Sequence, residues 1–223
     1  MRGRVPHSTR CIRRLASFCG ASGEQIRNAG TVGGNIANGS PIGDLPPVFI
    51  ALGAQLVLRR GGTRRQIALE DYFLAYKKQD RAPGEFVESV LVPKLAENAL
   101  FHVSKISKRF DEDISALCGA FHLALDADGR IAAARIAFGG MAATPQRAPL
   151  TEAALLHRLW DADAVATAGR ALALDFQPLS DLRASKAYRL RVASNLLHRF
   201  LLETTQPAVR TRVAGTIGSR ALA

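Results

Sequence analysis

The stretch Gln25–Pro47, QIRNAGTVGGNIANGSPIGDLPP, is the most distinctive part of the chain. Fourteen consecutive positions within it carry five glycines: Gly30, Gly33, Gly34, Gly39 and Gly43. Glycine at this density argues against a regular helix or strand, and it lets the backbone adopt positive φ and approach a ligand closely. Short polar side chains lie between the glycines. We therefore predict an irregular loop whose N–H groups suit a pyrophosphate or another polyanion.

Composition alone leaves a second interpretation of this stretch open, that of a glycine-rich surface loop with tight turns. The spacing matches neither G-x-G-x-x-G after a strand nor G-x-x-x-x-G-K-[ST], so it supports neither a Rossmann NAD site nor a phosphate-loop NTPase. Asp44 is expected to be the N-cap of a short helix over residues 44–54, DLPPVFIALGA, because prolines follow in its first turn.

Strand signals follow this helix. AQLVLRRG and GTRRQIALE, joined at Gly61-Gly62, predict a β-hairpin. We expect a short helix over residues 71–76 and a strand over residues 85–93, stopped by Pro93.

The composition changes after a polar joint at residues 94–98. Apolar and polar residues alternate over residues 101–110 and 116–126, and the turn at 126–129 leads into a second hairpin. Helical spacing then predicts three helices, over residues 151–159, 161–175 and 185–203. The chain is therefore predicted to be α+β, with an antiparallel sheet of three or more strands covered by helices.

The net charge of +11 over 223 residues is concentrated in two tails. Residues 1–22 hold five arginines and residues 205–223 hold three, with no acid in either, so residues 23–204 carry only +3. No aromatic-interleaved basic patch accompanies the tails, so we do not expect nucleic-acid binding. No apolar run is long enough for a membrane helix, which needs roughly 18 residues. The arginine-rich start resembles a transit peptide superficially, and we interpret it as an irregular N-terminus.

The chain shows no sequence signal for a metal site. Its three cysteines form no C-x-x-C pair: Cys11, Cys19 and Cys118. Cys118 is expected to be a reduced core residue, and the odd count favours the cytoplasm. His122 and His198 are expected to be surface or packing residues. The adjacent acids Glu112 and Asp113 face opposite ways on a strand, so we interpret them as structural or interfacial.

Three motifs carry a family resemblance. Residues 31–44, TVGGNIANGSPIGD, resemble the FAD-binding loop of the xanthine dehydrogenase and carbon monoxide dehydrogenase flavoprotein family of molybdenum hydroxylases. Residues 107–121, SKRFDEDISALCGAF, and residues 136–148, IAFGGMAATPQRA, are similar to the C-terminal domain of that family. The resemblance spans about residues 23–204, and the variants NGSPIGD and KRFDEDIS favour the branch of the xanthine dehydrogenase small subunit.

The resemblance implies an FAD site and no catalytic side chain. Asp44 would hydrogen-bond the cofactor, Val87 would touch it with an apolar side chain, and Lys105 would lie near the isoalloxazine. A cation there favours the anionic reduced flavin, although Lys105 by itself suggests a solvated strand lysine. The loop residues would wrap the pyrophosphate and the adjoining flavin: Thr31, Val32, Gly33, Gly34 and Asn35.

The resemblance also implies a division of the chain: an irregular basic N-terminus (1–22), the C-terminal part of an FAD-binding domain (23–94), a flavoprotein C-terminal α+β domain (99–204) and a basic tail (205–223). The family's upstream glycine-rich segment and its [2Fe–2S] cysteines have no counterpart here. We therefore expect an N-terminally truncated form, with the molybdenum cofactor and the [2Fe–2S] clusters in a missing region or a partner subunit.

The function implied by the resemblance is that of an oxidoreductase subunit. A purine is hydroxylated at the molybdenum cofactor of a large subunit, and electrons pass through iron–sulfur clusters to FAD and then to NAD. We expect a cytoplasmic hetero-oligomer in which this chain is not active alone. The alternative is an inactive truncated remnant that acts only as an assembly or interaction domain.

Overall fold

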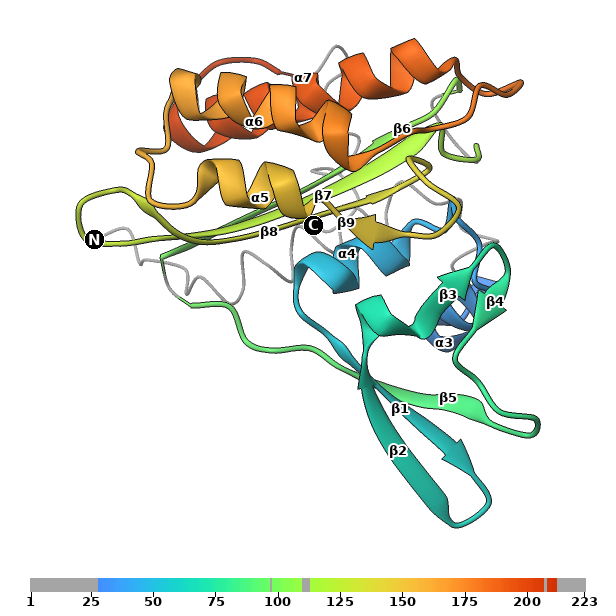
Figure 1. Ribbon diagram of the computed structural model, residues 1–223. Helices are drawn as coiled ribbons and strands as arrows, with labels where there is room; N and C mark the ends of the chain where they lie inside the picture. Colours follow the sequence, from blue (N-terminus) through green and yellow to red (C-terminus); the bar gives the residue numbers. More distant parts are fainter. Residues whose placement is uncertain (1–27, 97, 110–112, 207, 212–223) are drawn as a thin grey trace.

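The computed structural model describes residues 28–96, 98–109, 113–206 and 208–211. The predicted basic N-terminus, Cys11, Cys19, Glu112 and most of the basic tail lie outside the described residues. Figure 1 shows two parts: a small lobe with a projecting hairpin, and an antiparallel sheet with three helices on one face. The predicted α+β class is confirmed.

The small lobe contains a three-stranded antiparallel sheet of order β2-β1-β5 and the predicted hairpin. Gly61 takes the positive φ of 58° that the hairpin turn requires. The elements of this lobe are α3 (Val32–Ala37), α4 (Leu45–Ala51), β1 (Gln55–Arg60), β2 (Thr63–Ala68), the 3₁₀ helix η1 (Leu69–Tyr72), β3 (Phe73–Ala75), β4 (Lys78–Gln79) and β5 (Phe86–Leu91).

The prediction of an irregular loop is wrong at its centre, where α3 forms. The Thr31 hydroxyl accepts a hydrogen bond of 2.9 Å from the Gly34 N–H and so caps this short helix. A Cβ on Gly34 would lie 2.8 Å from that hydroxyl oxygen. Glycine at this position therefore permits the cap. Among the described residues of this stretch, 28–47, only Gly39 has a positive φ.

The helix predicted over residues 71–76 is also wrong. A 3₁₀ turn ends at Tyr72, and Phe73 then begins a strand that pairs with β4. Leu69 and Tyr72 are both fully buried, and the Tyr72 and Phe73 rings meet edge to face at 5.3 Å. Packing of these side chains in the core decides the local conformation, which sequence spacing over six residues does not specify.

The second part of the chain forms the four-stranded antiparallel sheet β6-β7-β8-β9, with three helices on one face (Figure 1). The predicted strands, the turn at 126–129 and the three helices are confirmed, although α5 is shorter than expected. Their bounds are β6 (Ala99–Ile106), β7 (Leu117–Leu125), β8 (Ile131–Gly139), β9 (Gln146–Arg147), α5 (Pro149–Leu155), α6 (Ala162–Asp175) and α7 (Lys186–Thr205).

This sheet is buried on both faces. Leu117, Phe121 and Leu123 of β7 pack in one core with the helices. On the opposite face, Ala120 and Ala137 are fully buried in a second core together with α4 and with Phe101 of β6. Small residues let a helix approach a sheet closely. The small lobe is therefore joined to the sheet through α4, and the second core contains residues from both parts of the chain.

Other residues singled out in the sequence lie in structural positions. Cys118 is buried, as predicted, and burial raises the pKa of its thiol well above the ordinary range. His122 is partly buried, and its burial lowers its pKa, whereas His198 is exposed. No helix in the described part of the chain is long and apolar enough to cross a membrane.

Ala137→Leu tests the contact between α4 and the sheet. The added methyl groups have no space at this fully buried position, so we expect the free energy of unfolding to fall by about 1–3 kcal/mol in urea titrations. Ala133→Leu is the matched control, because Ala133 is an exposed alanine of the same strand. Its effect should stay within about 0.5 kcal/mol. Equal effects of the two variants would contradict the tight contact.

Candidate functional site

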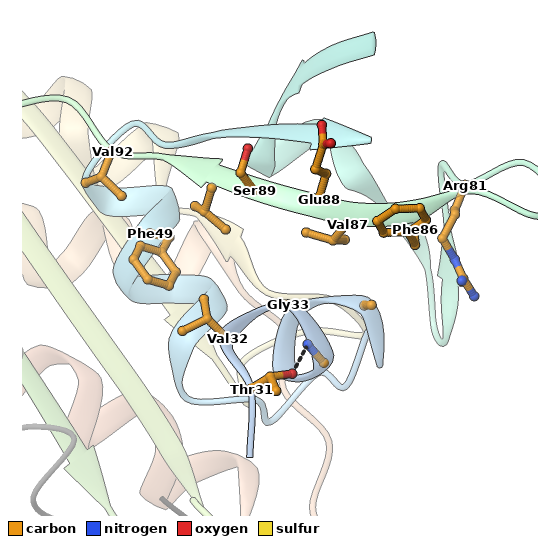
Figure 2. Close-up of a pocket in the computed structure, with 13 residues that line it drawn as sticks. Thr31, Val32, Gly33, Phe49, Arg81, Phe86, Val87, Glu88, Ser89 and Val92 are labelled. Carbon is orange, nitrogen blue, oxygen red and sulfur yellow. Dashed lines mark hydrogen bonds between the residues drawn. The ribbon is translucent and has the colours of Figure 1, made fainter. Parts of the chain in front are cut away.

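An open groove of about 670 Å³ lies between α3, α4 and the outer strand β5 (Figure 2). This volume is in the range of ordinary ligand pockets, roughly 300–1,000 Å³. Five of the eight residues predicted to contact the cofactor line it: Thr31, Val32, Gly33, Gly34 and Val87. Residues far apart in the chain thus meet in one groove.

The first turn of α3 lies directly beside β5. A Cβ built on Gly33 would lie 3.6 Å from the Val87 carbonyl oxygen and would point at that strand. The first turn of α3 therefore presents almost no side-chain bulk beside the groove. Asn35 is exposed on α3 and is absent from the groove lining.

The charge around the groove is biased toward positive. Glu88 lines the groove, but Arg64 Nε lies 2.6 Å from one of its oxygens and Arg59 Nη1 lies 2.8 Å from the other. Hydrogen bonds from Arg64 and Arg59 lower the pKa of Glu88 to about 2. The two guanidinium groups more than offset this carboxylate, and Arg81 adds a further positive charge to the lining. Such a groove favours an anionic ligand.

Asp44 and Lys105, also predicted to contact the cofactor, do not line the groove. Lys105 Nζ lies 2.8 Å from Asp44 Oδ2, and the Ser115 hydroxyl donates to Asp44 Oδ1. These contacts connect the start of α4 to the second sheet. The predicted contacts of Asp44 and Lys105 with FAD stay predictions.

Asp44 does occupy the N-cap position of α4, but its side chain makes no capping hydrogen bond. A capping oxygen accepts from the N–H of the second or third helical residue. In α4 these residues are Pro46 and Pro47, which have no N–H to donate. The carboxylate is consequently available to Lys105.

Sequence reasoning missed Phe49, Arg81, Phe86 and Val92, which also line the groove. They come from α4, from the turn before β5, and from β5 and its continuation. The pattern of a strand predicts which of its side chains share a face, but it does not predict which helix will pack beside the strand. No local signal marks these positions as parts of one site.

A second polar cluster resembles a catalytic triad in its connectivity. His102 Nε2 lies 2.8 Å from the Ser104 hydroxyl, and His102 Nδ1 lies 3.0 Å from Glu203 Oε2. Both His102 and Ser104 are buried, and neither lines the groove. We interpret this cluster as a buried link between β6 and α7. Among the described residues, no group of three histidine, cysteine or acidic side chains could hold a metal ion.

Both parts of the chain match models of known protein families. The FAD binding domain in molybdopterin dehydrogenase matches residues 4–95, and the CO dehydrogenase flavoprotein C-terminal domain matches residues 102–204. Xanthine dehydrogenase of Emericella nidulans is 32% identical over 80% of this chain. Xanthine dehydrogenase/oxidase of Rattus norvegicus is 29% identical over 88% of it. The chain spans only 13% and 15% of the lengths of these two relatives.

Solved structures give the same result. Carbon monoxide dehydrogenase from Hydrogenophaga pseudoflava superposes with a TM-score of 0.79 at 29% identity, over 84% of this chain and 65% of the matched chain. Quinoline 2-oxidoreductase from Pseudomonas putida 86 superposes with a TM-score of 0.78 over 93% of this chain and 72% of the other. At 24% identity, the second match supports the fold alone.

The chain therefore belongs to the flavoprotein family of the molybdopterin dehydrogenases, which includes xanthine dehydrogenase-like and CO dehydrogenase-like proteins. It carries an FAD-binding domain of an oxidoreductase family, as the three motifs implied. The groove fits such a cofactor, because glycines at positions 33 and 34 leave the α3 turn accessible and the surrounding charge suits a pyrophosphate.

Asp44→Asn tests the ion pair that connects the two parts of the chain. The Asp44 and Lys105 side chains are only 22% and 15% exposed, so the variant leaves an ammonium group largely buried without its anion. We expect the free energy of unfolding to fall by about 1–3 kcal/mol in urea titrations. Asp71→Asn, which changes an exposed carboxylate, is the control. A loss no larger than that of the control would contradict the role of the pair.

Glu88 should make stability depend on acid pH. Its pKa is about 2 in the folded chain against an ordinary value of 4.5, so its contribution is present above pH 4.5 and is lost as the pH falls toward 2. Glu88→Gln should flatten this part of the curve of unfolding free energy against pH. Asp128→Asn, in an exposed turn, controls for the loss of one acid. An unchanged slope in Glu88→Gln would disprove the contribution.

Proposed function

We propose that this chain supplies part of the FAD site of a molybdenum hydroxylase resembling xanthine dehydrogenase and passes electrons from iron–sulfur clusters through FAD to NAD. One observation carries the proposal. The family's loop residues in α3 and Val87 of β5, which are separated by more than fifty positions, line the same groove. Membership of the flavoprotein family supports the identity of the ligand.

Each part of the groove has a proposed task. The first turn of α3, from Thr31 to Gly34, binds the pyrophosphate through backbone N–H groups at the helix N-terminus. Val87 gives an apolar contact to the cofactor, and Asn35 donates from the same short helix. FAD, when bound, supplies an acceptor for two electrons and a hydride donor. Lys105, oriented by Asp44, places a positive charge toward the flavin and stabilises its anionic reduced form.

The rest of the electron-transfer chain is proposed to lie outside this chain. A large subunit would carry the molybdenum cofactor, and the [2Fe–2S] clusters would belong to another region or subunit. The name of the xanthine dehydrogenase relatives supports a purine as the oxidised substrate and a dehydrogenase reaction. NAD is the acceptor that we propose. We propose a cytoplasmic hetero-oligomer, in which this chain is inactive without its partners.

An assembly or interaction domain without flavin is the second candidate. It is favoured by the exposed apolar side chains beside the groove: Val32 is 45% exposed, Phe86 51% and Val92 41%. Exposed apolar surface of this kind becomes buried by a ligand or a partner protein. Flavin binding separates the two candidates, because only the first predicts about one FAD per chain.

Gly33→Glu tests the FAD site directly. The backbone at Gly33 accepts a Cβ at ordinary contact distance, and the new carboxylate would stand beside the proposed pyrophosphate. We expect the purified full chain to bind FAD, with a flavin absorbance that corresponds to about one FAD per chain. The variant should bind at least about tenfold more weakly, which corresponds to roughly 1.4 kcal/mol.

Gly62→Glu is the matched control, because a Cβ on Gly62 meets nothing within 4 Å in the hairpin turn. It adds the same charge to the chain at a position that does not line the groove. Equal weakening by both variants would indicate a general effect of charge and would contradict the site. A colourless wild-type chain that ignores added FAD would favour the assembly domain.

A further inference from the structure

The Asp44 carboxylate has a hydrogen-bond donor on each of its two oxygens. Lys105 Nζ lies 2.8 Å from Oδ2, and the hydroxyl of Ser115, just before β7, donates to Oδ1. Ser115 is only 1% exposed, so solvent has little access to this contact. The terminal torsion of a free carboxylate is soft. The second donor therefore fixes the plane of the Asp44 carboxylate and the direction in which that carboxylate holds Lys105.

Ser115 replaces the backbone donors that an N-cap carboxylate normally has. The second and third residues of α4 are Pro46 and Pro47, so neither supplies an N–H. In the described part of the chain, only Ser115 and Lys105 donate to this carboxylate. Without the Ser115 hydroxyl, Asp44 would be held by Lys105 alone.

The backbone beside Ser115 is paired with the backbone beside Lys105. The Ala116 N–H donates to the Ile106 carbonyl oxygen at 2.7 Å. Each of these two residues directly follows one of the donors to Asp44. Both donors are therefore carried by segments of backbone that are hydrogen-bonded to each other.

Arg189 of α7, which is 3% exposed, holds the segment of Ser115 in place. Its Nη1 donates to the carbonyl of Ala116 and, at 2.8 Å, to that of Gly140. Its Nη2 lies 2.7 Å from Asp181 Oδ1. Gly140 has a φ of 83°, and a Cβ there would lie only 2.6 Å from the Ala116 carbonyl oxygen. Glycine therefore lets both carbonyl groups approach one guanidinium group, which anchors this segment to α7.

We propose that Ser115 is a positioning residue for the flavin. It orients the Asp44 carboxylate and, through it, the Lys105 ammonium group, while Arg189 keeps Ser115 in place. A cation that is already held in position beside oxidised flavin needs no reorganisation to stabilise the negative charge of the reduced form. Ser115 thus acts on the cofactor without touching it. This inference rests on the proposed FAD function and adds the residues that fix the position of Lys105.

The test measures the reduction potential of FAD bound to the full chain, which reports the ratio of the affinities for reduced and oxidised flavin. Lys105→Met removes the cation and should lower this ratio about tenfold, which makes the potential of a two-electron couple about 30 mV more negative. Ser115→Ala should lower the ratio about threefold or more and leave the affinity for oxidised FAD within about threefold. In the Lys105→Met background, Ser115→Ala should cause no further shift, because Ser115 acts through Lys105.

Ser104→Ala is the matched control. Ser104 is also buried, and its hydroxyl lies 2.8 Å from His102 Nε2 and does not contact Asp44. Each serine variant removes one buried hydroxyl, so both should lower the urea concentration at the midpoint of unfolding. Only Ser115→Ala should change the potential. Equal shifts of the potential in the two variants would overturn the inference, because a general loosening of the fold would then explain them.

The other outcomes separate this inference from the proposed function. A wild-type chain that binds no FAD overturns both. An unchanged potential in Lys105→Met overturns the inference and the task proposed for Lys105, while FAD binding stands. A shift in Lys105→Met together with an unchanged potential in Ser115→Ala overturns the role of Ser115 alone. A further shift in the double variant also overturns that role, because Ser115 would then act by another route.

Discussion

The packing of α4 against the second sheet is the contact on which the groove depends. Ala120 and Ala137 provide a surface flat enough for the helix, and a Cβ on Gly139 would lie only 3.3 Å from the Gly43 carbonyl oxygen just before it. Phe49 of α4 forms one wall of the groove. Since α3 precedes α4 by only a short connection, the sheet fixes the wall directly and the α3 turn indirectly. Because protein interiors are close-packed, these elements have little freedom to move relative to one another.

The electrostatic potential in the groove depends on arginines that do not line it. Glu88 would by itself repel a pyrophosphate, but Arg59 and Arg64 bind it from the neighbouring strands of the hairpin. In the turn before β5, Arg65 binds both Glu85 and Asp80, and Arg81 takes part in no ion pair among the described residues. The predicted hairpin thus has a role beyond its fold. Its arginines set the sign of the potential at a site that they do not line.

Much of the fold was predictable, because strand alternation and helical spacing are local patterns. The hairpin at Gly61 and the second sheet with its helices followed from them. The α3 helix did not, because glycine content concealed a capped turn that depends on one hydroxyl, that of Thr31. The family resemblance predicted five residues of the groove lining, four of them in the loop motif and the fifth Val87. Arg81 and Phe86 could not be predicted as lining residues, because their place in the groove depends on how β5 packs against α3.

The short helix α4 connects two groups of residues that the family resemblance implies: the residues that line the groove, and the pair formed by Asp44 and Lys105. Asp44 begins α4 and pairs with Lys105 of β6, and Phe49, near its end, reaches the groove. At about 1.5 Å per residue, the seven residues of α4 span only roughly 10 Å. Partly buried ion pairs add little net stability, but they fix geometry. Because Pro46 and Pro47 remove the usual capping partners, the Asp44 carboxylate holds Lys105, and one helix sets the position of both the cation and the groove wall.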